Sequence, residues 1–144
     1  MTSGALHRVF VFGTLKQGFP NFHVNRGRRL PGDFRTALAY PLYLVGERHS
    51  PWLLDQPGQG QPVRGQVFEV DDAVLADMDR LERVTEPDGY RRVAIVVVGE
   101  ADGQRLAVQA YLKDPGQLGA TLGRLGPLAE FTLAHAALYR PRTD

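Results

Sequence analysis

A carboxylate on the apolar side of a predicted helix is the strongest candidate for chemistry in this sequence. Asp71-Asp72 would begin a helix over residues 73 to about 84, because an aspartate there accepts hydrogen bonds from the free N–H groups of the first turn. On a helical wheel that starts at Leu75, Met78 falls at about 300° and Glu82 at about 340°, within one apolar arc. Burial is costly for a carboxylate and raises its pKa towards neutrality. Glu82 is therefore a candidate general acid or base.

Two structural alternatives stay open for Glu82 at this point. The side chain could lie at the frayed end of the helix and bend into water. It could also form an ion pair with Arg91 or Arg92, which follow in the next predicted strand. Either arrangement would remove the reason for assigning it a chemical role.

A glycine-containing loop near the start of the chain is the second candidate. Residues 9–12, Val-Phe-Val-Phe, are β-branched or aromatic, as is typical of a buried strand. Gly13 and Gly18 would allow the backbone to turn, and residues 14–17 between them have N–H groups that no strand ladder needs. Such a run of amides can bind an anion. The alternative is an ordinary strand followed by a glycine turn.

Other arrangements of reactive residues are weak. The histidines His7, His23, His49 and His135 have no metal-ligand spacing, so no metal is expected. Neither Ser3 nor Ser50 lies in a Gly-x-Ser-x-Gly motif, and the absence of cysteine removes a thiol nucleophile. No Walker loop or Gly-x-Gly-x-x-Gly motif is present, so no cofactor is expected. Tyr111 faces away from Val108 and Ala110 on its predicted strand; it is either a packing residue or a hydroxyl inside a barrel, and we include it among the substrate-binding candidates.

The composition predicts one soluble domain over residues 1–144. Hydrophobic residues make up 43% and charged residues 23% of the sequence. A net charge of +1 gives no reason to expect nucleic acid or a membrane surface as a partner. No apolar run approaches the roughly 18 residues that span a bilayer. The first eight residues have no apolar signal-peptide core, so we expect a cytoplasmic protein.

The pattern of short elements predicts an α+β fold with a curled sheet or a partly closed barrel. Strands are expected at 34–39, 42–45, 63–70, 90–98 and 105–112, and residues 52–54 form a further apolar run. Gly65 would interrupt one strand as a bulge or a close backbone contact, and residues 100–103 would form a hairpin turn. A second helix is expected from Pro127 to about Leu138. The basic cluster Arg26, Arg28 and Arg29 is interpreted as a solvated face.

The loop is also where the sequence resembles a known family. Residues 12–18, Phe-Gly-Thr-Leu-Lys-Gln-Gly, resemble the Tyr-Gly-Thr-Leu-Lys-x-Gly signature of the γ-glutamyl cyclotransferase superfamily. Further matching segments follow in the family's order: Tyr40-Pro41-Leu42, Val45-Gly46-Glu47, Pro51-Trp52-Leu53-Leu54, Gly65-Gln66-Val67-Phe68 and Met78-Asp79-Arg80-Leu81-Glu82. The Pro-Trp-Leu-Leu element is similar to the γ-glutamylamine cyclotransferase branch. The resemblance covers residues 9–112, and residues 139–142 resemble the family's tail, whereas 113–138 do not align.

This resemblance implies a small mixed β-barrel with flanking helices. It implies release of 5-oxoproline from a small-molecule γ-glutamyl amine, without a metal or cofactor. The family's substrate loop falls on Phe12, Gly13, Thr14 and Leu15, and its catalytic glutamate falls on Glu82, the residue that the helical wheel indicates.

Two departures from the family pattern leave an alternative open. The family's tyrosine is replaced by Phe12, and its histidine after the asparagine is displaced, since Asn21 is followed by Phe22 and then His23. A non-catalytic relative that binds a γ-glutamyl or amino-acid ligand would show such changes. The sequence does not indicate an oligomeric state or the amine that leaves.

Overall fold

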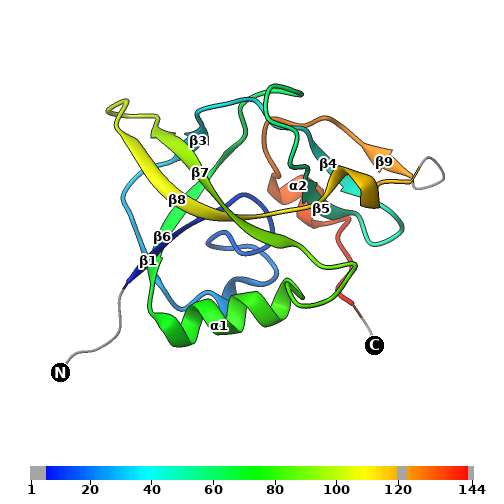
Figure 1. Ribbon diagram of the computed structural model, residues 1–144, viewed down its shortest axis with the longest axis horizontal. Helices are drawn as coiled ribbons and strands as arrows, with labels where there is room; N and C mark the ends of the chain where they lie inside the picture. Colours follow the sequence, from blue (N-terminus) through cyan, green and yellow to red (C-terminus); the bar gives the residue numbers. More distant parts are fainter. Residues whose placement is uncertain (1–5, 120–122, 143–144) are drawn as a thin grey trace.

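Five strands close into a barrel in the computed structural model, which describes residues 6–119 and 123–142 (Figure 1). In spatial order they are β1 (His7–Val11), β8 (Arg105–Leu112), β7 (Arg91–Gly99), β3 (Phe34–Thr36) and β6 (Arg64–Val70). Pairing of β1 with β6 closes the ring, with Val9 opposite Phe68. The β1–β8 pair is parallel and the other pairs of the ring are antiparallel, so the barrel is mixed. The predicted α+β fold with a small mixed barrel is confirmed.

A smaller sheet lies beside the barrel. It consists of β5 (Ser50–Leu53), β4 (Leu42–Val45) and β9 (Arg124–Leu125), and a short strand, β2 (Arg28–Arg29), adds to β6 of the barrel. The small sheet meets the barrel at the end of β8, where Leu54 and Lys113 form a parallel bridge. The Lys113 N–H donates to the Leu53 carbonyl at 2.8 Å. This junction fixes the position of Lys113 relative to both sheets.

Helix α1 (Asp72–Leu81) packs across one side of the barrel. The predicted cap is confirmed, because the Val74 N–H donates to Asp71 Oδ1 at 2.9 Å. The helix ends at Leu81, earlier than the expected residue 84. The physical reason is Arg83, whose φ of 56° is left-handed and stops the helix just after Glu82.

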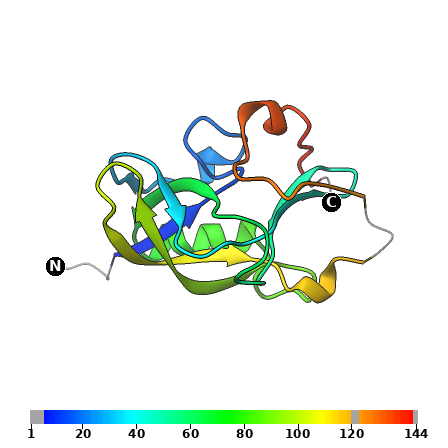
Figure 2. The same ribbon diagram turned by 90° about the horizontal axis from the view of Figure 1, so that it is seen from above.

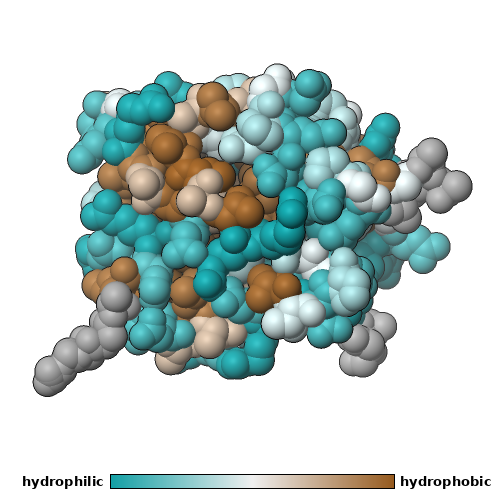
Figure 3. Space-filling model, in the orientation of Figure 1, coloured by the Kyte–Doolittle hydropathy of each residue, from teal (hydrophilic) through white to brown (hydrophobic). Residues whose placement is uncertain are grey.

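Two hydrophobic clusters account for the core. The first fills the barrel and the contact with the small sheet, and its largest fully buried members are Phe10, Leu42, Leu44, Leu53, Leu112 and Phe131. The second lies between the barrel and α1 and consists of Val9, Val11, Leu15, Phe68, Val70, Val74, Leu75, Met78 and Tyr111. Figure 3 shows further hydrophobic side chains on the outer face of the barrel; among the exposed ones in the described chain is Val96 of β7.

The predicted helix from Pro127 to about Leu138 is wrong in most of its length. Only α2 (Leu133–Ala136) is helical there. The main chain that precedes α2 is hydrogen-bonded to other segments and not to itself. The Leu128 N–H donates to the Leu42 carbonyl, and the Arg64 N–H donates to the Ala129 carbonyl, each at 2.8 Å. Phe131 is fully buried in the barrel cluster. The apolar residues of this segment therefore pack into the core from an extended chain and do not form the apolar face of a helix.

The C-terminal segment is held against the loop that follows β1, as the two lie side by side in Figure 2. Lys16 is only 2% exposed, and its ammonium donates to the Phe131 carbonyl at 2.5 Å and lies 4.3 Å from the centre of the Phe19 ring. Phe19 and Phe131 also contact each other, with ring centroids 5.8 Å apart. Burial lowers the pKa of Lys16 to about 8.

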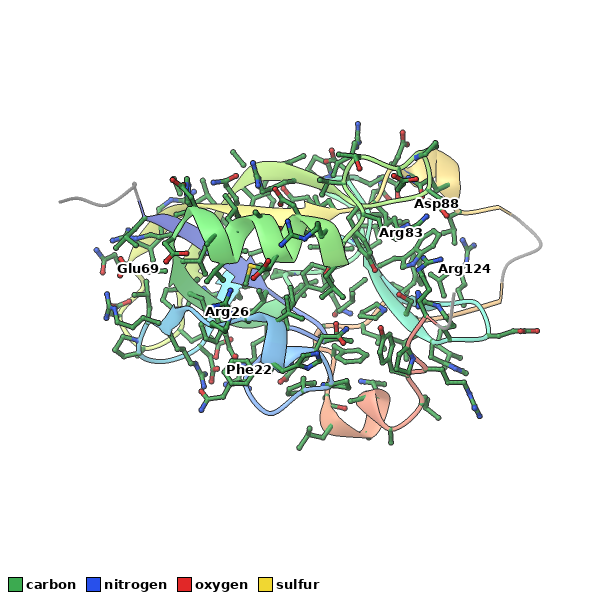
Figure 4. The ribbon with its side chains drawn as sticks, turned by 90° about the horizontal axis from the view of Figure 1, so that it is seen from below. Phe22, Arg26, Glu69, Arg83, Asp88 and Arg124 are labelled. Atoms are coloured by element: carbon green, nitrogen blue, oxygen red, sulfur yellow. The ribbon has the colours of Figure 1, made fainter. Side chains whose placement is uncertain are left out.

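The basic cluster lies on the surface, as predicted, and is paired with carboxylates. Arg26 pairs with Asp77 of α1, Arg28 with Glu69 and Arg29 with Asp33. Figure 4 shows Arg26 on the side of the molecule that α1 covers. Among the described helices none is long and apolar enough to cross a membrane. Ser3 and the rest of 1–5 lie outside the described residues.

Candidate active site

The C-terminal end of α1 fixes the main chain of Glu82 on both sides. Its N–H donates to the Met78 carbonyl at 2.9 Å, and its carbonyl accepts from the Tyr90 N–H at 3.0 Å. Between these two residues the chain makes a compact turn, in which Gly89 approaches Arg83 closely. A Cβ on Gly89 would lie 1.7 Å from the Arg83 carbonyl oxygen. Figure 4 shows Arg83 and Asp88 together at this turn, where they form an ion pair of 3.1 Å.

The loop after β1 presents unused backbone donors. In the described part of the chain, the N–H groups of Gly13, Thr14 and Leu15 donate no hydrogen bond. The Lys16 N–H, by contrast, donates to the Gly13 carbonyl at 3.1 Å and closes the turn. Three free donors in sequence suit an anion or a developing oxyanion.

Glycine is required at position 13 for a different reason from the one the sequence indicates. Gly18 has the left-handed φ of 86°, but Gly13 does not have a positive φ. A Cβ at Gly13 would instead lie 2.7 Å from Cγ of Pro51. The close approach of the loop to the small sheet therefore excludes a side chain there.

One cavity of about 370 Å³ brings the sequence-predicted residues together. Phe12, Gly13, Thr14 and Leu15 line it from the loop, Glu82 from the end of α1 and Tyr111 from β8. These residues come from three elements that are far apart in the sequence. A carboxylate thus shares a cavity with a set of free backbone donors, which is the arrangement needed for proton transfer beside a bound anion.

Neither structural alternative for Glu82 is found. Arg91 pairs with Asp55 and Arg92 with Asp79, so the two arginines have other carboxylates. The Glu82 side chain is partly buried in the cavity wall and makes no hydrogen bond or ion pair with another described residue. Burial raises the pKa of its carboxyl group to about 7, although the positive charges of Lys113 and Arg48 act in the opposite direction.

Tyr111 is 3% exposed and belongs to the cluster beneath α1. Its hydroxyl donates to Asp79 Oδ1 at 2.7 Å. Burial, together with this bond to an anion, raises the pKa of the phenol strongly, so it stays protonated. The ring lines the cavity while the hydroxyl is occupied by the helix.

Several cavity residues were not singled out from the sequence. Tyr90 lines the wall beside Glu82, and its hydroxyl donates to the Pro51 carbonyl at 2.7 Å. Lys113 is 4% exposed and lies over the rings of Trp52 and Tyr90, 4.3 and 4.7 Å from their centres. Its place two residues after Tyr111, on the same side of an extended chain, was an available signal. Arg48 has no pattern of its own in the sequence that would indicate this position.

The residues at which the sequence departs from the family pattern lie in different surroundings. Asn21 lines the cavity, and its side-chain amide donates to Thr14 Oγ1 at 2.9 Å and to the Tyr139 hydroxyl at 3.3 Å. His23 is exposed and does not line the cavity. Tyr139, from the tail segment, therefore brings a phenol into the site although Phe12 has none.

The fold is a mixed barrel, and one of its cavities contains both a carboxylate and the backbone donors of a loop. Sequence comparison assigns the chain to a protein family. The family described as gamma-glutamyl cyclotransferase, AIG2-like, matches residues 9–127. The chain belongs to this family. The match extends past residue 112, where the resemblance of individual motifs ends.

Known relatives agree with this assignment. The gamma-glutamylaminecyclotransferase of Bos taurus is 42% identical over 104 residues, which cover 69% of this chain and 61% of the bovine protein. The human protein of the same name is 43% identical over 94 residues, covering 62% of this chain and 60% of the relative. The matched part of the chain thus spans about six-tenths of these relatives. The crystal structure of an AIG2-like protein from Mus musculus superposes with a TM-score of 0.77 at 29% identity and covers 96% of this chain and 98% of the mouse chain.

Proposed function

We propose that the protein is a γ-glutamylamine cyclotransferase, which converts a γ-glutamyl amine into 5-oxoproline and the free amine. The observation that carries the proposal is the shared cavity of Glu82 and the donor loop 13–15. Membership of the family and the names of the bovine and human relatives support it. A relative that only binds such compounds is not favoured by these names.

The proposed reaction needs no nucleophile from the protein. The α-amine of the γ-glutamyl group attacks its own γ-carbonyl carbon, so a C–N bond forms and closes a five-membered ring. The original amide C–N bond then breaks. Holding the amine against the carbonyl is worth about 7–11 kcal/mol in well-oriented intramolecular reactions. Folding the substrate within the cavity is therefore the main task of the site.

Glu82 is proposed as the general acid and base. It accepts a proton from the substrate's α-ammonium group, which makes the amine nucleophilic, and returns a proton to the departing amine. The attacking nitrogen gives up a second proton as the ring forms, and the amine departs as an ammonium ion, so protons and charge balance without water, metal or cofactor. A pKa of about 7 suits both halves of this exchange, because the carboxyl group is then neither permanently charged nor permanently protonated.

The loop and the aromatic residues are proposed to bind the γ-glutamyl group. The N–H groups of Gly13, Thr14 and Leu15 would receive the α-carboxylate or the oxyanion. The rings of Phe12 and Tyr111 would contact the aliphatic part of the substrate.

We further propose a cytoplasmic location, since a cysteine-free sequence needs no oxidising compartment.

The test is to incubate the protein with γ-glutamyl-ε-lysine, γ-glutamyl-alanine and glutathione and to measure 5-oxoproline. We expect product from γ-glutamyl-ε-lysine. Thermal stabilisation by these compounds without any product, at high protein concentration, would instead establish the binding-only alternative.

A further inference from the structure

Asn25 is a buried polar residue that contacts the donor loop 13–15 from outside the cavity. It follows the short 3-10 helix η1 (Phe22–Val24) and is only 2% exposed. Its side-chain N–H donates to the Leu15 carbonyl at 3.1 Å, and its side-chain oxygen accepts from the Gly27 N–H at 3.3 Å. Asn25 lines neither the candidate active-site cavity nor a second cavity, of about 500 Å³, that adjoins it. Any effect of Asn25 on a molecule bound in either cavity is therefore indirect.

A series of hydrogen bonds connects Asn25 to one of the free donors of the loop. The Asn25 amide holds the carbonyl of the peptide between Leu15 and Lys16. The N–H of that same peptide, from Lys16, donates to the Gly13 carbonyl at 3.1 Å. The Gly13 carbonyl in turn shares its peptide with the Thr14 N–H, which donates no hydrogen bond in the described chain. The series thus begins at a buried side chain and ends at a free donor of a residue in the cavity wall.

This series fixes the direction of the Thr14 N–H. The N–H and C=O of a trans peptide point in opposite directions, and the peptides of this loop are trans. Each carbonyl that is held on one side therefore turns the N–H of the same peptide to the other side. A donor that is aimed in this way before a ligand arrives needs no reorganisation when negative charge develops beside it.

The series also strengthens the last donor. Hydrogen bonds in a chain polarise one another, most effectively where water is excluded. Leu15 is 4% and Lys16 2% exposed, so these bonds lie in the interior. The Thr14 N–H is therefore expected to be a better donor to an anion than an isolated amide.

The Leu15 carbonyl depends on Asn25 for its partner. Among the described residues, no other hydrogen-bond donor to this carbonyl is found. Without the amide, a buried carbonyl would be unsatisfied, which is costly, and its peptide would rotate towards another donor. That rotation would draw the Lys16 N–H away from the Gly13 carbonyl and release the peptide that carries the Thr14 N–H.

We propose that Asn25 is a positioning residue of the reaction, which aims the Thr14 N–H at the anionic oxygen of the substrate through the main chain of Leu15 and Lys16. The inference rests on the proposed cyclotransferase function and adds to it a residue that does not touch the substrate. A purely structural Asn25 would affect stability alone.

A titration of the unsubstituted protein tests the connection directly. The probe is 5-oxoproline, because it retains both the carboxylate and the carbonyl oxygen that the loop is proposed to bind. In ¹⁵N-labelled protein we expect it to shift the NMR signals of the Thr14 N–H, the Lys16 N–H and the Asn25 side-chain amide. The side-chain amide of Gln61 is the matched control, because it also donates to a main-chain carbonyl but its residue lines neither cavity. A shift at Thr14 without one at Asn25, or no shift at either, overturns the inference.

A pair of variants measures the effect on the reaction. Asn25→Leu removes the donor at similar volume, and kcat/KM for γ-glutamyl-ε-lysine should fall at least about tenfold, a part of what deletion of a whole oxyanion donor costs. The pH at which kcat/KM rises should not move, since Glu82 is unchanged. Thr36→Val is the matched control, because it removes buried bonds of 2.6 Å to the Leu38 carbonyl and 2.9 Å from the Val63 N–H, and Thr36 lines neither cavity. Its kcat/KM should stay near that of the unsubstituted protein.

Both variants are assayed at a temperature at which they are folded. A kcat/KM of Asn25→Leu equal to that of Thr36→Val would establish a purely structural role and overturn the inference. Asn25→Ala takes its place if Asn25→Leu does not fold, with the same loss expected, and the titration decides if neither folds. Absence of 5-oxoproline formation by the unsubstituted protein overturns the proposed function, whereas the titration still tests the connection between Asn25 and Thr14.

Discussion

The hydroxyl of Tyr111 donates a 2.7 Å hydrogen bond to the carboxylate of Asp79 and so joins β8 to α1 one turn before Glu82. Asp79 also accepts from Arg92 of β7 at 2.5 Å. Its carboxylate is therefore a connection between the helix and two barrel strands. A substitution of Asp79 changes the support of Glu82 and is unsuitable as a neutral comparison.

The first prediction concerns this bond. Tyr111→Phe removes the hydroxyl but keeps the ring in the cavity. Its free energy of unfolding should fall by about 1–2 kcal/mol, because a buried hydrogen bond to a charged group is lost. KM for γ-glutamyl substrates should change little. Urea unfolding and steady-state kinetics measure the two effects, and a large rise in KM without a stability loss would assign the hydroxyl to the substrate.

The second prediction tests the proposed base. Glu82→Gln keeps size and helix propensity but cannot accept the proton, so turnover should fall at least about 100-fold. The melting temperature should stay constant or rise, since a buried carboxylate becomes a neutral amide. Glu86→Gln is the matched control, because Glu86 is exposed and lines neither cavity. Near-normal turnover in Glu82→Gln would remove Glu82 from the mechanism.

The third prediction is a pH dependence. Because burial raises the pKa of Glu82 to about 7, kcat/KM should rise with pH through that value as the base loses its proton. Stability should change in the opposite sense. Between 4.5, the ordinary value, and about 7 the folded protein binds more protons at this site than the unfolded chain, so the Glu82 contribution to stability falls as pH rises.

Unfolding experiments at pH 4.5 and 7.5 can isolate that contribution. The stability of Glu82→Gln relative to the unsubstituted protein should increase between these two pH values, because the variant lacks the titrating group. A constant difference would mean that Glu82 titrates at the same pH in the folded and unfolded chains.

The fourth prediction addresses the departure from the family signature. Phe12 is 6% exposed and lines the cavity, with its ring centroid 6.5 Å from that of Phe10. Phe12→Tyr adds one hydroxyl that the cavity should accept, so the variant should fold and keep activity within a few-fold. Circular dichroism and 5-oxoproline assays check both points, and failure to fold would show that the ring edge points into dry core.

The fifth prediction tests the turn that fixes Glu82. Gly89→Ala would place a Cβ 1.7 Å from the Arg83 carbonyl oxygen, so the turn must open. The variant should lose more than about 2 kcal/mol of stability and most of its turnover. Gly123→Ala is the control, because a Cβ there meets no atom of the described residues within 4 Å. Equal stability of the two variants would contradict the close approach.

The features that the sequence predicted correctly are those that depend on neighbouring residues. The Asp71 cap, the hairpin at 100–103 and strand 105–112 are as expected, because each depends on nearby residues. Gly65 makes the expected close contact, since a Cβ there would lie 2.4 Å from the Val11 carbonyl oxygen. The helix at 127–138 was wrong because Phe131 packs into the barrel core and the Leu128 N–H bonds to the distant strand β4, which no local pattern shows.

Only some residues of the candidate site could be predicted from the sequence. Glu82 could be found from helical periodicity, and the loop from its glycines and the family signature. Lys113 could have been found from its place two residues after Tyr111, whereas Tyr90 and Arg48 could not, because their roles depend on how the small sheet meets the end of β8. The position of Gly13 was predicted for the wrong physical reason, since the constraint is the close approach of Pro51 and not the backbone angle.

The sequence has two lysines, and the fold buries both, Lys16 beside the C-terminal segment and Lys113 between the two cavities. Positive charge at the surface therefore comes from arginine, which amine-acylating reagents do not modify. Acylation of the Lys16 ε-amine requires the loop and the tail to separate, whereas Lys113 lines a cavity that a small reagent can enter. The rate of acylation at Lys16 is thus a direct chemical measure of how often the contact between loop and tail opens.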